Sequence, residues 1–168
     1  MLGVIICDDD RFMVDISVGL AKKCIDEKKL PIKVLDRQAV MCFHRLSYRL
    51  IQHFKPDSVL GFGMIDPINA AYISAAGNSI ECSGNREGNK QFDALFLYTC
   101  NGEIPSVDEL LAYSRPNTFW VVHSIKNKGG KQLWKQILAD ERVRVTFDVT
   151  ETGIAFLHPE HHKITYVV

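Results

Sequence analysis

Apolar residues recur every three to four positions in two long stretches of the N-terminal third, and this spacing predicts helices. The first stretch, residues 12–27, ends before Pro31, and the second, residues 39–54, carries one apolar stripe and ends before Pro56. Short continuous apolar runs bounded by glycine, proline or polar residues instead predict buried strands. The predicted strands are residues 3–7, 32–35, 58–63, 79–82, 92–98, 118–124, 143–149, 153–157 and 163–168. The further predicted helices are residues 66–76, 107–113 and 130–139.

The order of these elements predicts an α/β fold of the three-layer, Rossmann-like type. Strands separated by single helices form β-α-β units, which give a mainly parallel sheet with right-handed crossovers. The last three strands are joined only by polar turns, residues 150–152 and 159–162, and connections this short predict antiparallel pairing. We therefore expect one domain over residues 1–168, with a mainly parallel sheet that ends in a C-terminal antiparallel hairpin.

Composition limits the class of protein. The chain has 168 residues, and its 20 Lys and Arg balance its 20 Asp and Glu, which argues against a general nucleic-acid binder because such proteins need surplus cations. No apolar run approaches the roughly 18 residues of a membrane span, and the first ten residues lack the basic start of a secretory signal. The five cysteines form no C-x-x-C pair, so reduced thiols in a cytoplasmic protein without a zinc site are expected.

The strand at residues 58–63 is where a ligand is expected, since ligands of open α/β sheets bind beyond the carboxyl ends of the strands. From residue 45 the chain reads RLSYRLIQHFKPDSVLGFGMIDPINAAYISAAG, which resembles the first motif of class I S-adenosylmethionine-dependent methyltransferases, in particular a bacterial group. Residues 92–97 resemble the fourth strand of that family, and residues 120–168 resemble its fifth strand, last helix and closing strands. The resemblance covers residues 39–168 and leaves residues 1–38 as a divergent N-terminal segment.

The resemblance implies which residues would line a cleft for S-adenosylmethionine. The candidate cofactor-binding residues are Gly61, Gly63, Asp66 and Glu81. Glu81 matches the acidic residue that ends the second strand and holds the ribose hydroxyls, and the alternative for it is a solvated strand-end carboxylate. Tyr98 would lie on the substrate side, and His123 would be the general base in a reaction driven mainly by proximity of the methyl group.

The same positions depart from the family pattern. Gly61 stands where the family has an acidic residue, Pro67 removes an amide donor from the helix start, and Asp66 adds negative charge beside a carboxylate-binding site. Tyr98 replaces the acid that closes the fourth strand, and His123 lies in a pair that replaces two acids after the fifth. The changes at Gly61, Asp66 and Pro67 weaken cofactor binding, and the loss of the acidic pair after the fifth strand removes substrate or metal contacts.

A further departure is the short interval between Glu81 and Phe92. Its ten residues, CSGNREGNKQ, are too few for even one crossover helix and strand. The third strand of the methyltransferase sheet is therefore expected to be missing.

Three hypotheses for function follow. The first is a methyltransferase-like protein that uses or once used S-adenosylmethionine, with weak or lost cofactor binding, so that an inactive homologue is favoured over an active methyltransferase. The second is a non-catalytic binding or assembly module whose exposed sheet edge at residues 79–82 pairs with a partner protein or a second copy. The third is a receiver-like signalling domain, because the opening resembles one in which Asp8, Asp9 and Asp10 would hold Mg²⁺. The histidines of residues 158–162 are expected to face water, with no functional metal site.

Overall fold

The computed structural model describes residues 37–63, 69, 72, 73, 76, 81–83, 88, 90–99 and 104–168. The elements predicted before residue 37, the three aspartates at residues 8–10, and Asp66 lie outside these described residues. The chain divides into two compact units, Met1–Lys55 with Asp66–Ser79, and Pro56–Ile65 with Ile80–Val168. Each unit is described by itself, and the single domain expected from the sequence stays a prediction.

Helix α2 (Arg37–Phe54) belongs to the first unit and confirms the helix predicted at residues 39–54. Its periodic apolar positions produce a buried face, which includes Phe43 and Leu50. His44 is also buried, and its ring stacks on that of Tyr72 with centroids 5.5 Å apart. The helix ends where Lys55 adopts a positive φ of 47°, which no longer continues the helical backbone.

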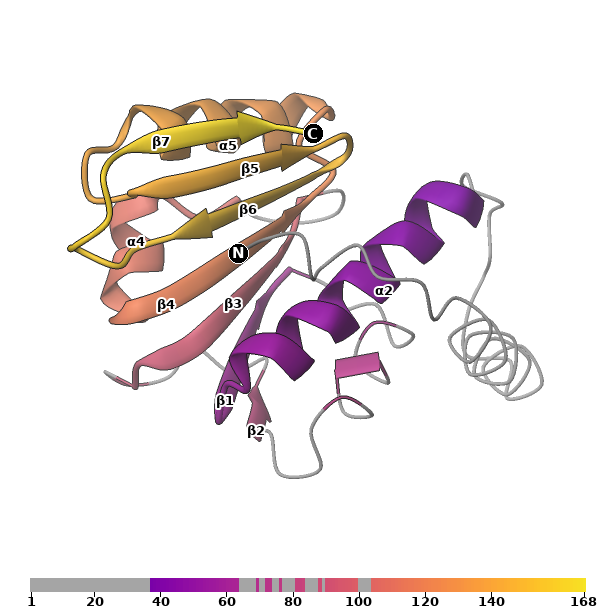
Figure 1. Ribbon diagram of the computed structural model, residues 1–168, viewed down its shortest axis with the longest axis horizontal. Helices are drawn as coiled ribbons and strands as arrows, with labels where there is room; N and C mark the ends of the chain where they lie inside the picture. Colours follow the sequence, from indigo (N-terminus) through magenta and orange to yellow (C-terminus); the bar gives the residue numbers. More distant parts are fainter. Residues whose placement is uncertain are drawn as a thin grey trace. The chain divides into compact units, whose positions relative to one another are not determined.

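The described residues of the second unit form one seven-stranded sheet in the order β2-β1-β3-β4-β6-β5-β7 (Figure 1). Its strands are β1 (Ser58–Phe62), β2 (Glu81–Ser83), β3 (Phe92–Tyr98), β4 (Ser114–His123), β5 (Val145–Val149), β6 (Thr152–Phe156) and β7 (Ile164–Val167). Four neighbouring pairs are parallel, and β6 is antiparallel to both β4 and β5. The predicted α/β class, the mainly parallel sheet and the closing β5–β6 hairpin are thereby confirmed.

Strand β2 forms one edge of the sheet, because among the described residues it pairs with β1 and nothing else. The connection from β2 to β3 contains no further described strand. The expectation that the third strand of the methyltransferase sheet is missing rests on the length of this interval, since a crossover needs about 10–12 residues, and it stays a prediction.

The antiparallel pairing predicted for the last strand is wrong. Strand β7 lies beside β5 and runs parallel to it, with Val145 in register with Ile164 and Phe147 with Tyr166. The preceding strand β6 is already paired on both edges, so the chain passes the start of β5 and uses its free edge. A short connection fixes the relative direction of β6 and β7, but it does not make them neighbours.

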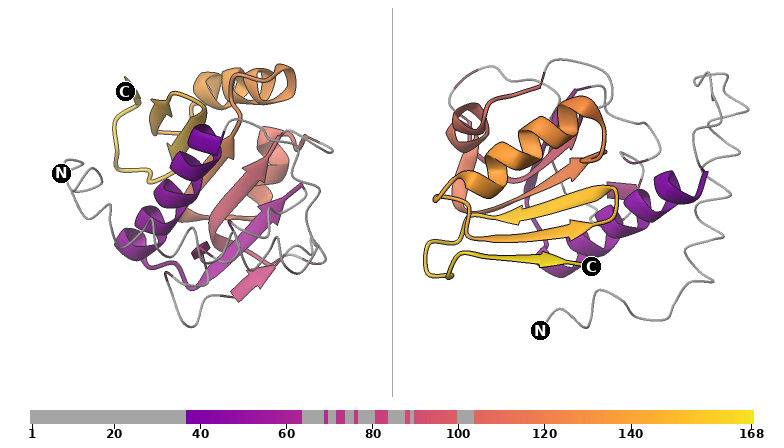
Figure 2. Two further views of the ribbon diagram at one scale, coloured as in Figure 1. Left: turned by 90° about the vertical axis from the view of Figure 1, so that its right-hand side faces the viewer. Right: turned by 90° about the horizontal axis from the view of Figure 1, so that it is seen from above.

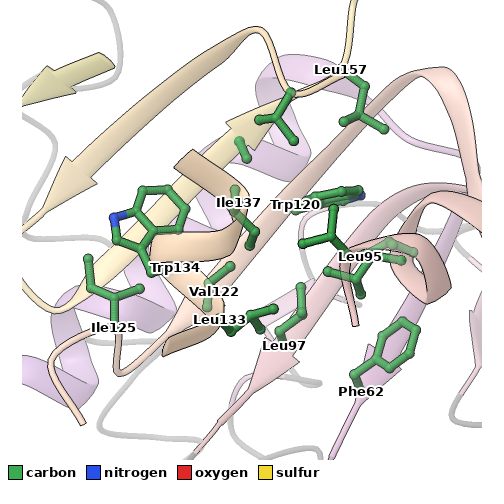
Figure 3. Packing of buried hydrophobic residues seen from close by; sticks show 14 of the residues in the cluster. Phe62, Leu95, Leu97, Trp120, Val122, Ile125, Leu133, Trp134, Ile137 and Leu157 are labelled. Carbon is green, nitrogen blue, oxygen red and sulfur yellow. The ribbon is translucent and has the colours of Figure 1, made fainter. Parts of the chain in front are cut away.

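Helices α4 (Val107–Ala112) and α5 (Lys128–Ala139) cover one face of the sheet (Figure 2). Their apolar side chains pack with those of the strands into one cluster around Trp120, Leu95, Leu133 and Ile137 (Figure 3). The indole of Trp134 lies on β6 at Gly153, where a Cβ would approach the ring to 2.5 Å. This glycine therefore sets how closely α5 approaches the sheet.

The central strands are buried on their second face as well, as is usual for parallel sheets. Val59, Phe96, Phe119, Val121 and Ile154 are all buried there.

No helix in the described part of the chain has the length and apolar character that crossing a membrane requires.

Candidate functional site

The carboxyl ends of β1, β3 and β4 meet at one edge of the sheet because these strands are parallel neighbours. Tyr98 at the end of β3 is in register with His123 at the end of β4, and Gly63 directly follows β1. Gly61 lies one step inside the edge, buried and in register with Phe96. The structure thus brings four of the six residues expected to line the cleft to one edge of the sheet.

Gly63 allows the chain to turn closely past the end of β3. Its φ is +86°, a conformation that side chains with a Cβ rarely adopt, and an added Cβ would lie 2.6 Å from the carbonyl oxygen of Tyr98. Only glycine satisfies both conditions. In this fold the glycine positions the first strand against the third.

The end of β4 is held by a compact group of polar contacts. The Thr99 hydroxyl donates to the carbonyl of His123 at 2.6 Å, and the Ser124 hydroxyl lies 3.0 Å from Nδ1 of His123. Ser124 has a positive φ of 61°, and its carbonyl accepts from the amide of Asn127 at 3.0 Å. These contacts turn the chain from β4 into α5 and engage one ring nitrogen of the half-buried His123 within the chain.

Gly130 closes this group from the side of α5. A Cβ at this position would lie 2.2 Å from the carbonyl oxygen of Ser124 and 2.7 Å from the hydroxyl of Thr99. The first turn of α5 therefore approaches the ends of β3 and β4 at a distance that excludes any larger residue. Neither Thr99 nor Gly130 stands out in the sequence, since their roles depend on where the helix begins over the sheet.

The prediction that Glu81 closes the second strand at this edge is wrong. Glu81 begins β2 and is in register with Ser58, the first residue of β1. The length of β1 separates that position from Gly63 by about 13 Å or more, at roughly 3.3 Å per residue. This register with Ser58 places the glutamate at the amino ends of the strands.

The described ends of β1, β3 and β4 carry no carboxylate: Gly63, Tyr98, Thr99, His123 and Ser124 occupy these positions. Nor does the described part of the chain contain three His, Cys, Asp or Glu side chains that could hold a metal ion together. His158 and His161 do lie near each other, with ring centroids 4.7 Å apart, in the connection between β6 and β7.

A bonded carboxylate that was not expected from the sequence lies at the amino ends of the strands. Oδ2 of Asp93 accepts from the amides of Asp57 and Ser58 at 3.1 and 3.0 Å and from the Ser58 hydroxyl at 2.9 Å. Its Oδ1 accepts from Nη1 of Arg115 at 2.5 Å. The visible signal is a single acid in the apolar run FDALFL. Because all its partners are structural, Asp93 fastens the start of β1 to β3.

Comparison with known proteins supports the fold and does not define a family by sequence. No family model matches the chain, and no match was found among curated proteins. Among solved structures, the chain is similar to the O-methyltransferase TomG of Streptomyces achromogenes, in complex with SAM, with a TM-score of 0.55 and 12% identity over 90% of this chain and 92% of that one. A methyltransferase from Geobacter sulfurreducens gives 0.56 and 14% over 91% and 92%.

A third similar structure is a putative caffeoyl-CoA O-methyltransferase from Staphylococcus aureus, with a TM-score of 0.56 and 10% identity over 88% of this chain and 98% of that one. Identities this low show the fold alone. The chain therefore has a class I methyltransferase-like fold, in agreement with the strand order and with the resemblance seen in the sequence.

Proposed function

We propose that this protein is a methyltransferase-like scaffold whose binding of S-adenosylmethionine is weak or lost. The observation that carries the proposal is the absence of a carboxylate from the described ends of β1, β3 and β4. The cofactor presents ribose hydroxyls and an ammonium group, all of which donate hydrogen bonds and are best held by ionised carboxylates. Glu81, the candidate for this role, begins β2 and therefore lies at the amino ends of the parallel strands.

The contacts at the edge support the same proposal. The carbonyls of His123 and Ser124 and the hydroxyl of Thr99 are engaged with one another and with the start of α5. A ligand that needed these groups would have to break contacts that already satisfy them, at a cost of about 1 kcal/mol or more for each hydrogen bond. These groups therefore have a structural role: they hold the ends of β3 and β4 against the start of α5.

His123 is the one candidate base, and its surroundings restrict what it could do. Its Nδ1 lies 3.0 Å from the hydroxyl of Ser124, so proton transfer to or from a substrate would have to use Nε2. A base alone contributes little to methyl transfer without a bound donor, because the reaction depends chiefly on holding the methyl group near its acceptor. Catalysis consequently depends on the cofactor site, which we propose has been lost.

The proposal is tested by calorimetric titration of the protein with S-adenosylmethionine and with S-adenosylhomocysteine. We expect no saturable heat up to about 1 mM ligand, which corresponds to binding weaker than about −4 kcal/mol. An active O-methyltransferase titrated under the same conditions serves as the control. A dissociation constant in the micromolar range would overturn the proposal and return the cleft residues to a binding role.

A second candidate function is that of a non-catalytic assembly module. At one edge of the sheet, β2 has no second neighbour among the described strands, which keeps residues 79–82 as a proposed partner site. At the other edge, β7 exposes all four of its residues, including Ile164 and Tyr166.

A further inference from the structure

The outer edge of β7 is an exposed, apolar strand edge. The strand pairs with β5 on one side and is the last in the described sheet. Of the six large hydrophobic side chains that are exposed in the described part of the chain, four lie in residues 164–168. The exposed fractions of Ile164, Tyr166 and Val167 are 43%, 44% and 81%. The large exposed hydrophobic side chains of the described residues are therefore concentrated on β7 and on Val168, which follows it.

The backbone of β7 presents groups along the same edge that pair with no described strand. The amides of Ile164 and Val168 donate to Arg144 and Asp148 on the β5 side at 2.8 and 2.9 Å. Because successive residues of a strand point their N–H and C=O groups to opposite sides, those of Thr165 and Val167 point away from β5. Such a row of outward groups is a template for pairing with another strand.

The features that normally prevent such pairing are missing from β7. Its sequence, ITYV, contains no charge and no proline. The cation that precedes the strand, Lys163, is directed back toward the end of α5, where its Nζ donates to the carbonyl of Asp140 at 2.5 Å and lies 3.6 Å from Glu141. The positive charge therefore does not project over the outer edge.

A row of aromatic rings extends across the sheet to this edge. The ring of Phe156 lies 6.1 Å from Phe119 and 6.1 Å from Phe147, and Phe147 stacks on Tyr166 at 4.8 Å and 8°. Phe119 and Phe147 are buried, whereas Tyr166 is exposed. The row thus ends abruptly at β7, and an apolar side chain beyond Tyr166 would extend it.

We propose that β7 pairs with β7 of a second copy of this chain, antiparallel and about a two-fold axis at Thr165. In this register the outward groups of the two Thr165 residues bond to each other, and those of Val167 bond to Lys163 of the other copy. Ile164 then lies opposite Tyr166 of the other copy in a pair without hydrogen bonds, where side chains approach most closely and aromatic and β-branched residues pair well.

A second copy fits better than an unrelated strand because the edge is self-complementary. The two-fold axis forms the contact between Ile164 of one copy and Tyr166 of the other twice. It also covers the exposed β7 edge of both copies at once. Two sheets join into one, and Ile164 of each copy adds an apolar side chain beyond the Tyr166 ring of the other. This inference does not depend on the state of the cofactor site, so a positive or negative titration with S-adenosylmethionine leaves it unaffected.

The dimer is tested by sedimentation equilibrium of the purified chain over a range of concentrations. A four-residue strand edge makes a small interface, so we expect a dissociation constant on the order of 10–100 µM. Val167→Pro removes an outward N–H but no bond to β5, and we expect it to weaken the dimer at least about tenfold. Val167→Thr keeps the N–H and the β-branched shape, and it should change the constant less than about threefold.

Both variants are checked for an unchanged melting temperature, because Val167 is largely exposed and its proline form should still fold. The inference is overturned if the wild-type chain stays monomeric near 1 mM, because any dimer with a binding free energy stronger than about −4 kcal/mol would be detected at that concentration. It is also overturned if the two variants associate equally well.

The register is tested separately by disulfide cross-linking under a mild oxidant. The proposed axis brings the Cα atoms at position 165 within about 5.5 Å of each other, inside the range that a disulfide spans. Those at position 167 lie about 14 Å apart, which no disulfide bridges. We expect a covalent dimer from Thr165→Cys and none from Val167→Cys or from the wild-type chain with its five cysteines. Efficient cross-linking of Val167→Cys would overturn the proposed register.

Discussion

The Cα of Gly63 lies so close to the end of β3 that a Cβ on it would stand 2.6 Å from the carbonyl oxygen of Tyr98. Rotation of a side chain cannot relieve this contact, because the oxygen that the Cβ would meet belongs to the backbone of a central strand. The joint between β1 and β3 at the carboxyl edge therefore depends on the absence of one carbon atom.

Gly63→Ala should destabilise the protein by about 3 kcal/mol or more, through both the positive φ and the contact with the carbonyl. Gly88→Ala is a matched control, since Gly88 has the same φ of +86° but nothing within 4 Å of its added Cβ. It should cost only the conformational penalty, about 1 kcal/mol. Urea unfolding measures both, and equal losses would show that backbone conformation alone matters at position 63.

Two adjacent glycines of α5 should respond differently to alanine. Gly130→Ala should destabilise by about 2 kcal/mol because its Cβ meets the backbone of Ser124 at 2.2 Å, although alanine is the better helix former. At Gly129 the obstacle is Cδ1 of Ile104 at 2.1 Å, the end of a flexible, exposed side chain. Gly129→Ala should therefore stay within about 1 kcal/mol of wild type. Thermal unfolding of both variants decides, and a stable Gly130→Ala protein would contradict the described joint.

At the amino edge, Asp93 should matter more for stability than its ion pair suggests. Its carboxylate accepts from the backbone amides of Asp57 and Ser58 as well as from Arg115. Asp93→Ala leaves those groups without a partner and should cost about 2–3 kcal/mol. Arg115→Ala removes only a half-exposed cation and should cost less than about 1 kcal/mol. If urea unfolding gives equal losses, the ion pair rather than the backbone bonds dominates.

Acid should weaken the contact that ties α5 to α4. Arg142 donates to the carboxylate of Asp140 from Nε and Nη2 at 2.9 and 2.6 Å, and to Asp108 at 2.6 Å. The hydrogen bonds from the Arg142 side chain hold the pKa of Asp140 below its usual 3.8. The bonded carboxylate therefore stabilises the folded state above about pH 4, and this contribution is lost as the pH falls through the lowered pKa.

Asp140→Asn should accordingly melt below the wild type at pH 7, and the difference should shrink as the pH is lowered from 4 toward 2. Melting temperatures recorded by circular dichroism across this range measure the effect. A difference that stays constant down to pH 2 would show that ionisation of Asp140 does not contribute.

Much of the fold follows from local pattern. The stripe of α2, the apolar run of β3 and the polar turn between β5 and β6 predict these elements to within one or two residues, because each is set by its own periodicity and boundaries. The position of β7 does not follow, since the connection after β6 fixes a direction and the choice of neighbour depends on which sheet edge is free.

The sequence predicts where the candidate site lies, at the carboxyl ends of the parallel strands, better than it predicts which side chains lie there. Gly63, Tyr98 and His123 lie at the carboxyl edge because parallel strands end together. Glu81 does not, since β2 begins at that residue and the register of a three-residue strand is invisible in its sequence. The contacts of Thr99 with His123 and of Gly130 with Ser124 arise only when the helix is placed over the sheet.

The most direct test of the central proposal is an NMR titration of the ¹⁵N-labelled protein with S-adenosylhomocysteine. The amides of Gly63, Thr99 and Ser124 report on the edge where this fold would hold the adenosyl group. With the ligand raised to about 1 mM, these resonances should keep their positions. Saturable shifts of the same three amides would contradict the proposed loss of cofactor binding.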